Sequence, residues 1–218
     1  MAMKIYVSPS SQIANTYAAG NTNEAVQCRR IALATVEALK RCGFEAKTNT
    51  GGDMYSRTKE SNEWGAHLHV PIHTNAFNGK LKGTRLFCFD TSGSGYKASA
   101  AILKQLQPVV PGESDGIKAA QYYEIRNSNA PCAYVEAAFH DNAEQAKWII
   151  DHVDDIAEAI CKGICEWAHV TYKAKSAGSR TIYRVQVGAF EQQANAERQR
   201  DELKAKGYKD AFIVKVEL

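Results

Sequence analysis

Long apolar runs are absent from this sequence. No stretch approaches 18 consecutive apolar residues, about the length that a membrane-spanning helix needs. The N-terminal stretch MAMKIYVSPSSQ has too short an apolar core for a signal peptide. We therefore expect no membrane partner, and a chain that stays in the cytoplasm where it is made until something else releases it.

Cysteine pairs of the CxxC type are also missing, although the chain has six cysteines. Closely spaced pairs are typical of zinc sites and redox motifs, and disulfides are rare in chains that are not exported. We predict that the cysteines are buried small apolar residues, without disulfides or a metal cluster, and that helical spacing of the last two reflects core packing. They are Cys28, Cys42, Cys88, Cys132, Cys161 and Cys165.

The sequence has little excess charge of either sign, with a formal net charge of +3. This is far from the concentrated basic patch that nucleic-acid binding needs, so we predict no nucleic-acid partner. The composition, 44% hydrophobic and 23% charged, is that of an ordinary globular protein and excludes disordered and fibrous classes. A length of 218 residues allows one or two domains.

Strand and helix patterns alternate through most of the chain. Predicted strands cover 4–10, 44–49, 67–75, 83–89 and 130–139, and predicted helices cover 22–43, 56–66, 95–107 and 142–170. Such alternation indicates an α/β fold. We predict a three-layer domain over residues 1–172, with a mostly parallel sheet and helices on both faces.

A second, smaller unit is predicted at the C-terminal end. Residues 173–179 are small and polar and suit a linker. After them come a strand pattern over 183–190, a helix pattern over 193–208 and a strand pattern over 210–218, which together make one βαβ unit. The 180–218 segment is too short to bury a convincing core alone, because chains below about 40 residues usually need a staple or a partner.

Polar and ionisable side chains occur where predicted strands end or helices begin. They cluster at 8–12, 21–27, 71–76 and 135–142. The carboxyl ends of parallel strands meet at one edge of a sheet, where ligands bind, so these segments should converge. Zinc takes nitrogen and carboxylate ligands, which favours Glu24 and His73, and Glu136 suits a general base.

Two stretches carry a resemblance to a known family. IHTNAFNGKLKGTRLF and APCAYVEAAFHDNAEQA resemble motifs of zinc-dependent N-acetylmuramoyl-L-alanine amidases of the amidase-3 type, in an order that extends over most of residues 4–168. The resemblance implies cleavage of the amide that joins N-acetylmuramic acid to L-alanine in peptidoglycan. It implies zinc ligands at Glu24 and His73 and a catalytic glutamate at Glu136. Asn75 is assigned to substrate binding, with loop shaping as the alternative.

One departure from the family concerns the first zinc ligand, a histidine in a DPGHGG motif. Here the corresponding stretch is SPSSQ, with Ser11 or Gln12 in place of the histidine. We predict His140 as the replacement ligand. Because a straight strand would place it about 13 Å from Glu136, the chain must bend after Ala138.

The tail resembles half of a SPOR domain, a module that binds peptidoglycan glycan strands. The resemblance lies in YRVQVGAFEQQANAERQRDELKAKGYKDAFIV, which supplies one of the two βαβ halves of a complete module. An isolated βαβ unit leaves sheet edges exposed, so two chains could pair their halves. We therefore predict a homodimer joined through residues 180–218.

Several functions remain open at this stage. A zinc amidase without an export signal fits a phage endolysin, released through holin pores, or a mother-cell autolysin, released by lysis. A catalytically inactive peptidoglycan-binding scaffold is an alternative, because the first histidine is missing. A metallocarboxypeptidase that trims stem peptides is another.

Overall fold

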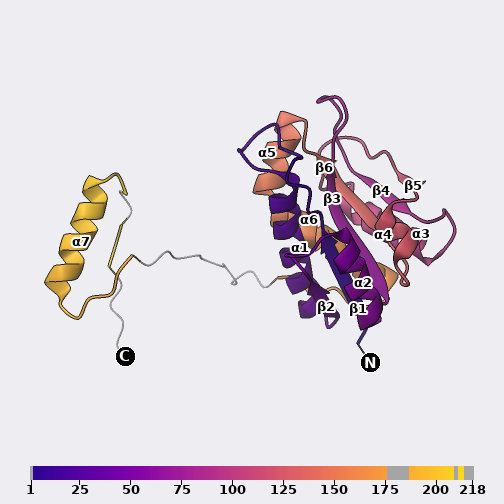
Figure 1. Ribbon diagram of the computed structural model, residues 1–218, viewed down its shortest axis with the longest axis horizontal. Helices are drawn as coiled ribbons and strands as arrows, with labels where there is room; N and C mark the ends of the chain where they lie inside the picture. The colour runs from indigo at the N-terminus through magenta and orange to yellow at the C-terminus, as the bar shows by residue number, and fades with distance from the viewer. Residues whose placement is uncertain (1, 176–186, 209–210, 214–218) are drawn as a thin grey trace. The chain divides into compact units, whose positions relative to one another are not determined.

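The computed structural model describes residues 2–175, 187–208 and 211–213 (Figure 1). The chain divides into two compact units, Met1–Lys175 and Ser176–Leu218. Within the larger unit, residues 168–175 follow the last helix and still contact it, since the Tyr172 hydroxyl donates to Glu158.

A six-stranded sheet forms the centre of the larger unit. Its strands are β1 Lys4–Pro9, β2 Glu45–Thr48, β3 Leu68–Asn75, β4 Arg85–Cys88, β5 Ile117–Ala119 and β6 Tyr134–Phe139. They lie in the order β2-β1-β3-β6-β4-β5, and every pairing is parallel except that of β4 with β6. The predicted mostly parallel α/β sheet is therefore confirmed.

One face of the sheet is apolar and is covered by long helices. Helices α1 (Glu24–Arg41) and α3 (Ser94–Leu106) both pack on α6 (Val153–Trp167), and α1 also contacts β1, β2 and β3. Ile5 and Val7 of β1 enter the core that these helices close. Helix α1 begins two residues inside the predicted range, because the Asn23 side chain accepts a hydrogen bond from the Val26 amide and caps the helix.

The opposite face is polar and is covered by α2 (Met54–Trp64) and the short α4 (Tyr123–Asn127). Alternate residues of a strand point to opposite faces, so Tyr6 and Ser8 point here. The Tyr6 hydroxyl donates to Glu60 of α2, and Arg57 of α2 donates to Ser8. The predicted three layers are thus present, but the second interface consists largely of hydrogen-bonded side chains.

Observed helix bounds differ from the predicted ones at several places, and two of the differences have a clear local cause. The helix predicted over 142–170 is broken at His152, whose backbone (φ −120°, ψ 30°) ends α5 (Ala143–Asp151) before α6 begins. Acidic residues in the first turn of α6 favour a new helix start there, because they complement the helix dipole. Helix α2 begins two residues before the prediction, at a capping box formed by Asp53 and Ser56.

The smaller unit contains helix α7, Gln193–Ala205. The strands predicted over 183–190 and 210–218 fall mostly outside the described residues, and no strand is assigned to 187–190 or 211–213. Across the described parts of both units, no helix is long and apolar enough to cross a membrane.

Candidate active site

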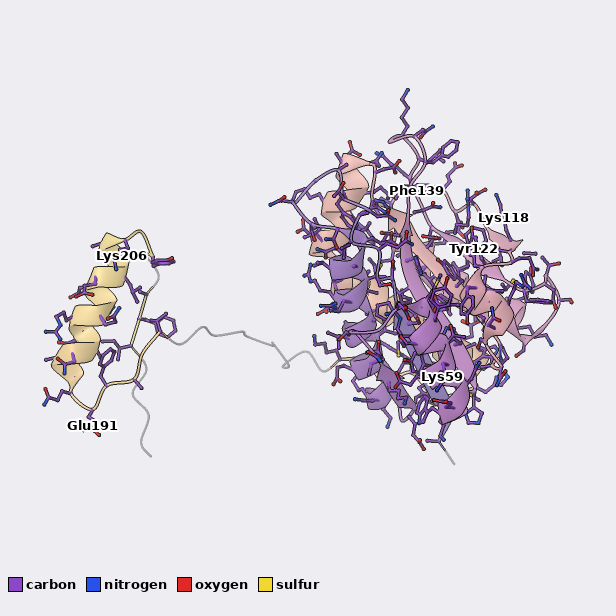
Figure 2. The ribbon with its side chains drawn as sticks, in the orientation of Figure 1. Lys59, Lys118, Tyr122, Phe139, Glu191 and Lys206 are labelled. Atoms are coloured by element: carbon purple, nitrogen blue, oxygen red, sulfur yellow. The ribbon has the colours of Figure 1, made fainter. Side chains whose placement is uncertain are left out.

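Glu24 and His73 meet at the carboxyl edge of the sheet. Glu24 is the first residue of α1, and His73 lies near the end of β3. Their side chains are buried, and Oε1 of Glu24 lies 2.8 Å from Nδ1 of His73. Phe139, labelled in Figure 2, ends β6 and marks this edge of the sheet. The structure therefore brings together the two predicted ligands from residues 49 positions apart.

Both members of this pair favour their charged forms. Burial alone would raise the pKa of Glu24, but the hydrogen bond and charge of His73, with hydrogen bonds from Asn15 and Ser10, lower it. Burial alone would lower the pKa of His73, but the carboxylates of Glu124, Glu24 and Glu136 raise it to about 9. Without an ion, a proton on His73 supplies the positive charge that the surrounding carboxylates require.

Glu136 lies beside this pair on β6. It is directly in register with His73 in the parallel β3–β6 pairing, so both side chains point to the same face. Its Oε2 atom is buried and has no hydrogen-bond partner among the described residues. Burial raises the pKa of Glu136 to about 7, against the lowering effects of His73 and Arg85. A carboxyl group with this pKa can take up or release a proton near neutral pH.

The loop after β1 places the amide side chains of Gln12 and Asn15 beside Glu24 and His73. Nε2 of Gln12 lies 3.4 Å from Nδ1 of His73. Asn15 donates to Oε1 of Gln12 at 2.9 Å and to Oε2 of Glu24 at 2.5 Å. Ser11 instead accepts a hydrogen bond from Arg57. Of the two residues that stand in place of the family histidine, Gln12 is therefore the one beside the candidate ligands.

His140 does not join this group through its hydrogen bonds. The pairing of β3 with β6 shifts register between His73 and Asn75, so the strand is irregular where a bend is expected. However, Nδ1 of His140 lies 3.0 Å from Oγ1 and 2.9 Å from the carbonyl oxygen of Thr74, and its ring stacks on Tyr17. These contacts engage Nδ1 and the ring face rather than Nε2, and the ligand role predicted for His140 stays a prediction.

Asn75 shapes the loop that follows β3. Its Oδ1 atom accepts a hydrogen bond from the amide of Ala76 at 2.8 Å, and its carbonyl accepts one from the amide of His140 at 2.8 Å. The first contact is that of a side chain fixing its own turn. Substrate binding by Asn75 stays a prediction.

A buried carboxylate that sequence analysis missed lies behind His73. Glu124 of α4 has Oε2 3.8 Å from Nε2 of His73 and Oε1 3.2 Å from Nε2 of His69, and it accepts a hydrogen bond from Ser8. Burial alone would raise the pKa of Glu124, but His69 and His73 lower it to about 2. No pattern pointed to Glu124, because α4 has only five residues and Glu124 follows no strand.

Tyr134 and Arg85 are the remaining neighbours of His73 and Glu136. The Tyr134 ring stacks on the His73 ring, with centroids 4.5 Å apart. Arg85 is in register with Glu136 across the antiparallel β4–β6 pairing and forms an ion pair with Asp115. Its Nε atom, like Oε2 of Glu136, is buried without a hydrogen-bond partner in the part of the chain that the structure describes. Two orphaned polar atoms at one site can be satisfied by a substrate or by water.

This combination of fold and site defines a class of protein. An α/β domain that gathers carboxylates and a histidine at the carboxyl edge of a mostly parallel sheet has the groups that hydrolytic chemistry needs. A family model described as N-acetylmuramoyl-L-alanine amidase matches residues 11–166, and the chain belongs to this family. A SPOR domain model matches residues 167–215.

Two curated relatives align over nearly the whole chain. The sporulation-specific N-acetylmuramoyl-L-alanine amidase of Bacillus subtilis is 25% identical over 221 residues, which cover 98% of this chain and 85% of the relative. The N-acetylmuramoyl-L-alanine amidase CwlM of Bacillus licheniformis is 24% identical over 225 residues, which cover 97% and 85%.

Solved structures with this fold include amidase catalytic domains. The catalytic domain of CwlV from Bacillus (Paenibacillus) polymyxa has a TM-score of 0.70 at 18% identity, covering 78% of this chain and 99% of that domain. The catalytic domain of the CD27L endolysin, which targets Clostridia difficile, has a TM-score of 0.65 at 22% identity, covering 75% and 97%. These likenesses confirm the predicted amidase fold.

Proposed function

We propose that this amidase hydrolyses the amide between N-acetylmuramic acid and L-alanine in peptidoglycan with zinc as its cofactor, and that Glu136 is its general base. The observation that carries the assignment of Glu136 is its buried Oε2 atom, which has no hydrogen-bond partner among the described residues. Glu136 itself lies in register with His73. Burying a carboxylate oxygen without a partner costs free energy, so its presence here supports a functional role.

The residues beside Glu136 fit a zinc ion. A carboxylate oxygen and an imidazole nitrogen, the donors that zinc prefers, lie 2.8 Å apart in Glu24 and His73. A ligating histidine must lose the proton that it holds without the ion, so zinc affinity should rise with pH. When bound, zinc supplies Lewis-acid polarisation of the scissile carbonyl and of the attacking water.

Gln12 is our candidate for the third side chain at the ion. Its carboxamide already lies beside Nδ1 of His73, whereas His140 is engaged by Thr74 and Tyr17. Zinc prefers an imidazole nitrogen to an amide oxygen, so the site should bind zinc more weakly than one with the family histidine. Glu124, 3.8 Å from Nε2 of His73, is positioned to fix the orientation of that ring from the side away from Glu24.

Glu136 then acts as general base and general acid in the hydrolysis. As a carboxylate it takes a proton from water as the water attacks the amide carbonyl, and it returns the proton to the leaving amine of L-alanine. Its pKa of about 7 suits both steps. Arg85, with an unpartnered buried Nε atom, is placed to donate a hydrogen bond to substrate.

Peptidoglycan is the partner of both units in this proposal. The SPOR match over 167–215 supports glycan binding by the tail. We retain homodimerisation through residues 180–218 as part of the proposal, because one βαβ unit leaves edges for a second copy to pair with.

The cellular setting remains that of an endolysin or a mother-cell autolysin, made in the cytoplasm and released to the wall. The alignment of 98% of this chain with a sporulation-specific amidase supports the autolysin, since it extends through the tail. A lysin needs the same chemistry, so the enzymatic proposal does not depend on this choice.

A digest of purified sacculi by wild type and by Glu136→Ala tests the function. We expect wild type with zinc to release whole stem peptides with a free L-alanine amine, and the variant to release almost none. Release of single terminal amino acids would instead indicate a metallocarboxypeptidase. Binding of sacculi without cleavage or zinc uptake would indicate the inactive scaffold. This alternative follows from the glutamine, Gln12, that stands in place of the family histidine.

A further inference from the structure

Three cysteine sulfurs converge far from the candidate active site. Cys42 follows the end of α1, and Cys161 and Cys165 lie one turn apart on the same face of α6. All three Sγ atoms lie within 4.8 Å of one another, and those of Cys42 and Cys161 are 3.7 Å apart. The three residues are at most 4% exposed. The helical spacing of Cys161 and Cys165 by itself predicts core packing. Packing alone would not require a third sulfur at the same place.

We propose that Cys42, Cys161 and Cys165 form a thiolate site for a soft divalent cation, with zinc as the occupant. Zinc binds thiolate sulfur at about 2.3 Å, which places two sulfurs of a tetrahedral site about 3.8 Å apart. The Cys42–Cys161 separation already matches this edge. Three thiolates leave one tetrahedral position for water or a carbonyl oxygen.

The surroundings of the sulfurs supply polar support. The amide of Lys173 donates to Sγ of Cys42 at 3.3 Å, and Nε of Arg41 donates to the Lys173 carbonyl at 2.8 Å. Amide donors and a nearby guanidinium stabilise thiolate charge, as expected of groups that surround metal-bound sulfur. Glu158 is the acidic group opposite, and it is paired with Arg41 at 2.6 Å. Cys42 also donates to the carbonyl of Lys173 at 3.8 Å, and Cys88, which is outside the cluster, donates to the carbonyl of Asp90.

Protons are already shared within the cluster. Hydrogen bonds from Cys161 and Cys42 and the charge of Arg41 lower the pKa of Cys165 to about 7, although burial opposes the shift. The hydrogen bond to Cys165, together with burial, raises the pKa of Cys161. The three sulfurs thus already interact with one another, as their separations require.

This site is independent of the active site. Glu24 opens α1 and Cys42 follows its other end, and 18 residues at about 1.5 Å each separate them by roughly 27 Å. Bound zinc would join the end of α1, the middle of α6 and, through Lys173, the segment that follows α6. Its expected role is to stabilise this end of the catalytic unit.

Cobalt titration of the full-length protein tests the proposal. The protein is reduced with a phosphine, stripped of metal and titrated with Co²⁺, whose thiolate charge-transfer absorption depends on sulfur ligands. We expect a band with the intensity of three thiolates at one equivalent. It should disappear in Cys161→Ser and weaken in Cys42→Ser, while Cys88→Ser, a buried cysteine outside the cluster, should retain it. Glu24→Gln should also retain it, because the active-site ligands contain no sulfur.

Two results would overturn the proposal. One is the absence of the band in the reduced wild type, and the other is an unchanged band in either Cys161→Ser or Cys42→Ser. Circular dichroism checks that each variant is folded. If Cys161→Ser does not fold, the result for Cys42→Ser decides the test. As a second readout, zinc should raise the Tm of Glu24→Gln by at least about 4 °C but leave Glu24→Gln/Cys42→Ser unchanged.

Discussion

At the scale of single residues, the site depends on carboxyl groups with very different environments. Glu124 accepts hydrogen bonds that hold its pKa at about 2, whereas Glu136 has an unpartnered buried oxygen and a pKa of about 7. The same chemical group is thus kept ionised in one position and ready to exchange a proton in the other. Each environment gives a measurable consequence.

Replacing Glu136 by Gln should stabilise the metal-free protein at neutral pH. Burial raises the pKa of Glu136 from 4.5 to about 7 in the folded state, so the native chain binds the proton more tightly than the unfolded chain. Its contribution to stability is therefore present below about pH 4.5 and is lost as pH rises to about 7. Urea unfolding with a chelator should show Glu136→Gln more stable by about 3 kcal/mol at pH 8 and no different at pH 4.

The exposed Glu113→Gln is the control for this measurement. It should show no such pH-dependent difference from wild type. A Glu136→Gln protein that is less stable than wild type at pH 8 would contradict the burial of an unpartnered carboxylate.

Gln12→His should restore the ligand set of the family. An imidazole beside Glu24 and His73 is a stronger zinc donor than an amide, so we expect zinc affinity to rise by about 10- to 100-fold. Competition with a fluorescent chelator measures it. His140→Ala is the matched comparison, because the ring of His140 is engaged by Thr74 and Tyr17. Loss of zinc in His140→Ala with no change in Gln12→His would restore the ligand role of His140.

At the scale of helices and strands, close packing decided features that the sequence pattern did not show. Gly163 lies where α6 crosses α3, and an added Cβ would collide with the backbone of Ile102. A helical glycine usually weakens a helix, so its presence here reflects the short distance between the two helices. Strand β5 and helix α4 are only three and five residues long, too short for a periodic pattern to emerge.

Gly163→Ala should destabilise the catalytic unit despite the higher helix propensity of alanine. The collision with Ile102 forces α3 and α6 apart, at a cost of about 1–3 kcal/mol. Urea unfolding measures this cost. Lys97→Ala on the exposed side of α3, the partner helix, should change stability by about 0.5 kcal/mol or less. A neutral or stabilising Gly163→Ala would mean that the helices can separate freely.

At the scale of the whole molecule, the chain combines a catalytic unit with a short second unit. The division after Lys175 follows a segment held to the catalytic unit by Lys173 and Tyr172, through the contacts with Arg41 and Glu158. The amidase family match ends at residue 166 and the SPOR match begins at 167. Catalysis and wall binding should therefore be separable by truncation.

Truncation to residues 1–175 should separate these properties. We expect the fragment to cleave soluble muropeptides at the full-length rate, within about twofold, because every candidate catalytic group lies within it. It should bind sacculi at least about tenfold more weakly, since the unit proposed to bind glycan is missing. Muropeptide digestion measures the first property and co-sedimentation with sacculi the second, and light scattering gives the oligomeric state. A monomeric full-length protein ends the dimer proposal, and unchanged sacculus binding by the fragment ends the role of the tail.

The sequence by itself determined the alternation of strands and helices, the start of α1 to within two residues, and the convergence of Glu24, His73 and Glu136. These follow from local periodicity, capping and the rule that parallel strands end at one edge. Tertiary structure alone decided that His140 turns to Thr74, that Gln12 and Glu124 reach His73, and that three cysteines meet. Such contacts depend on rotamers and on elements distant in the chain, which no local pattern encodes.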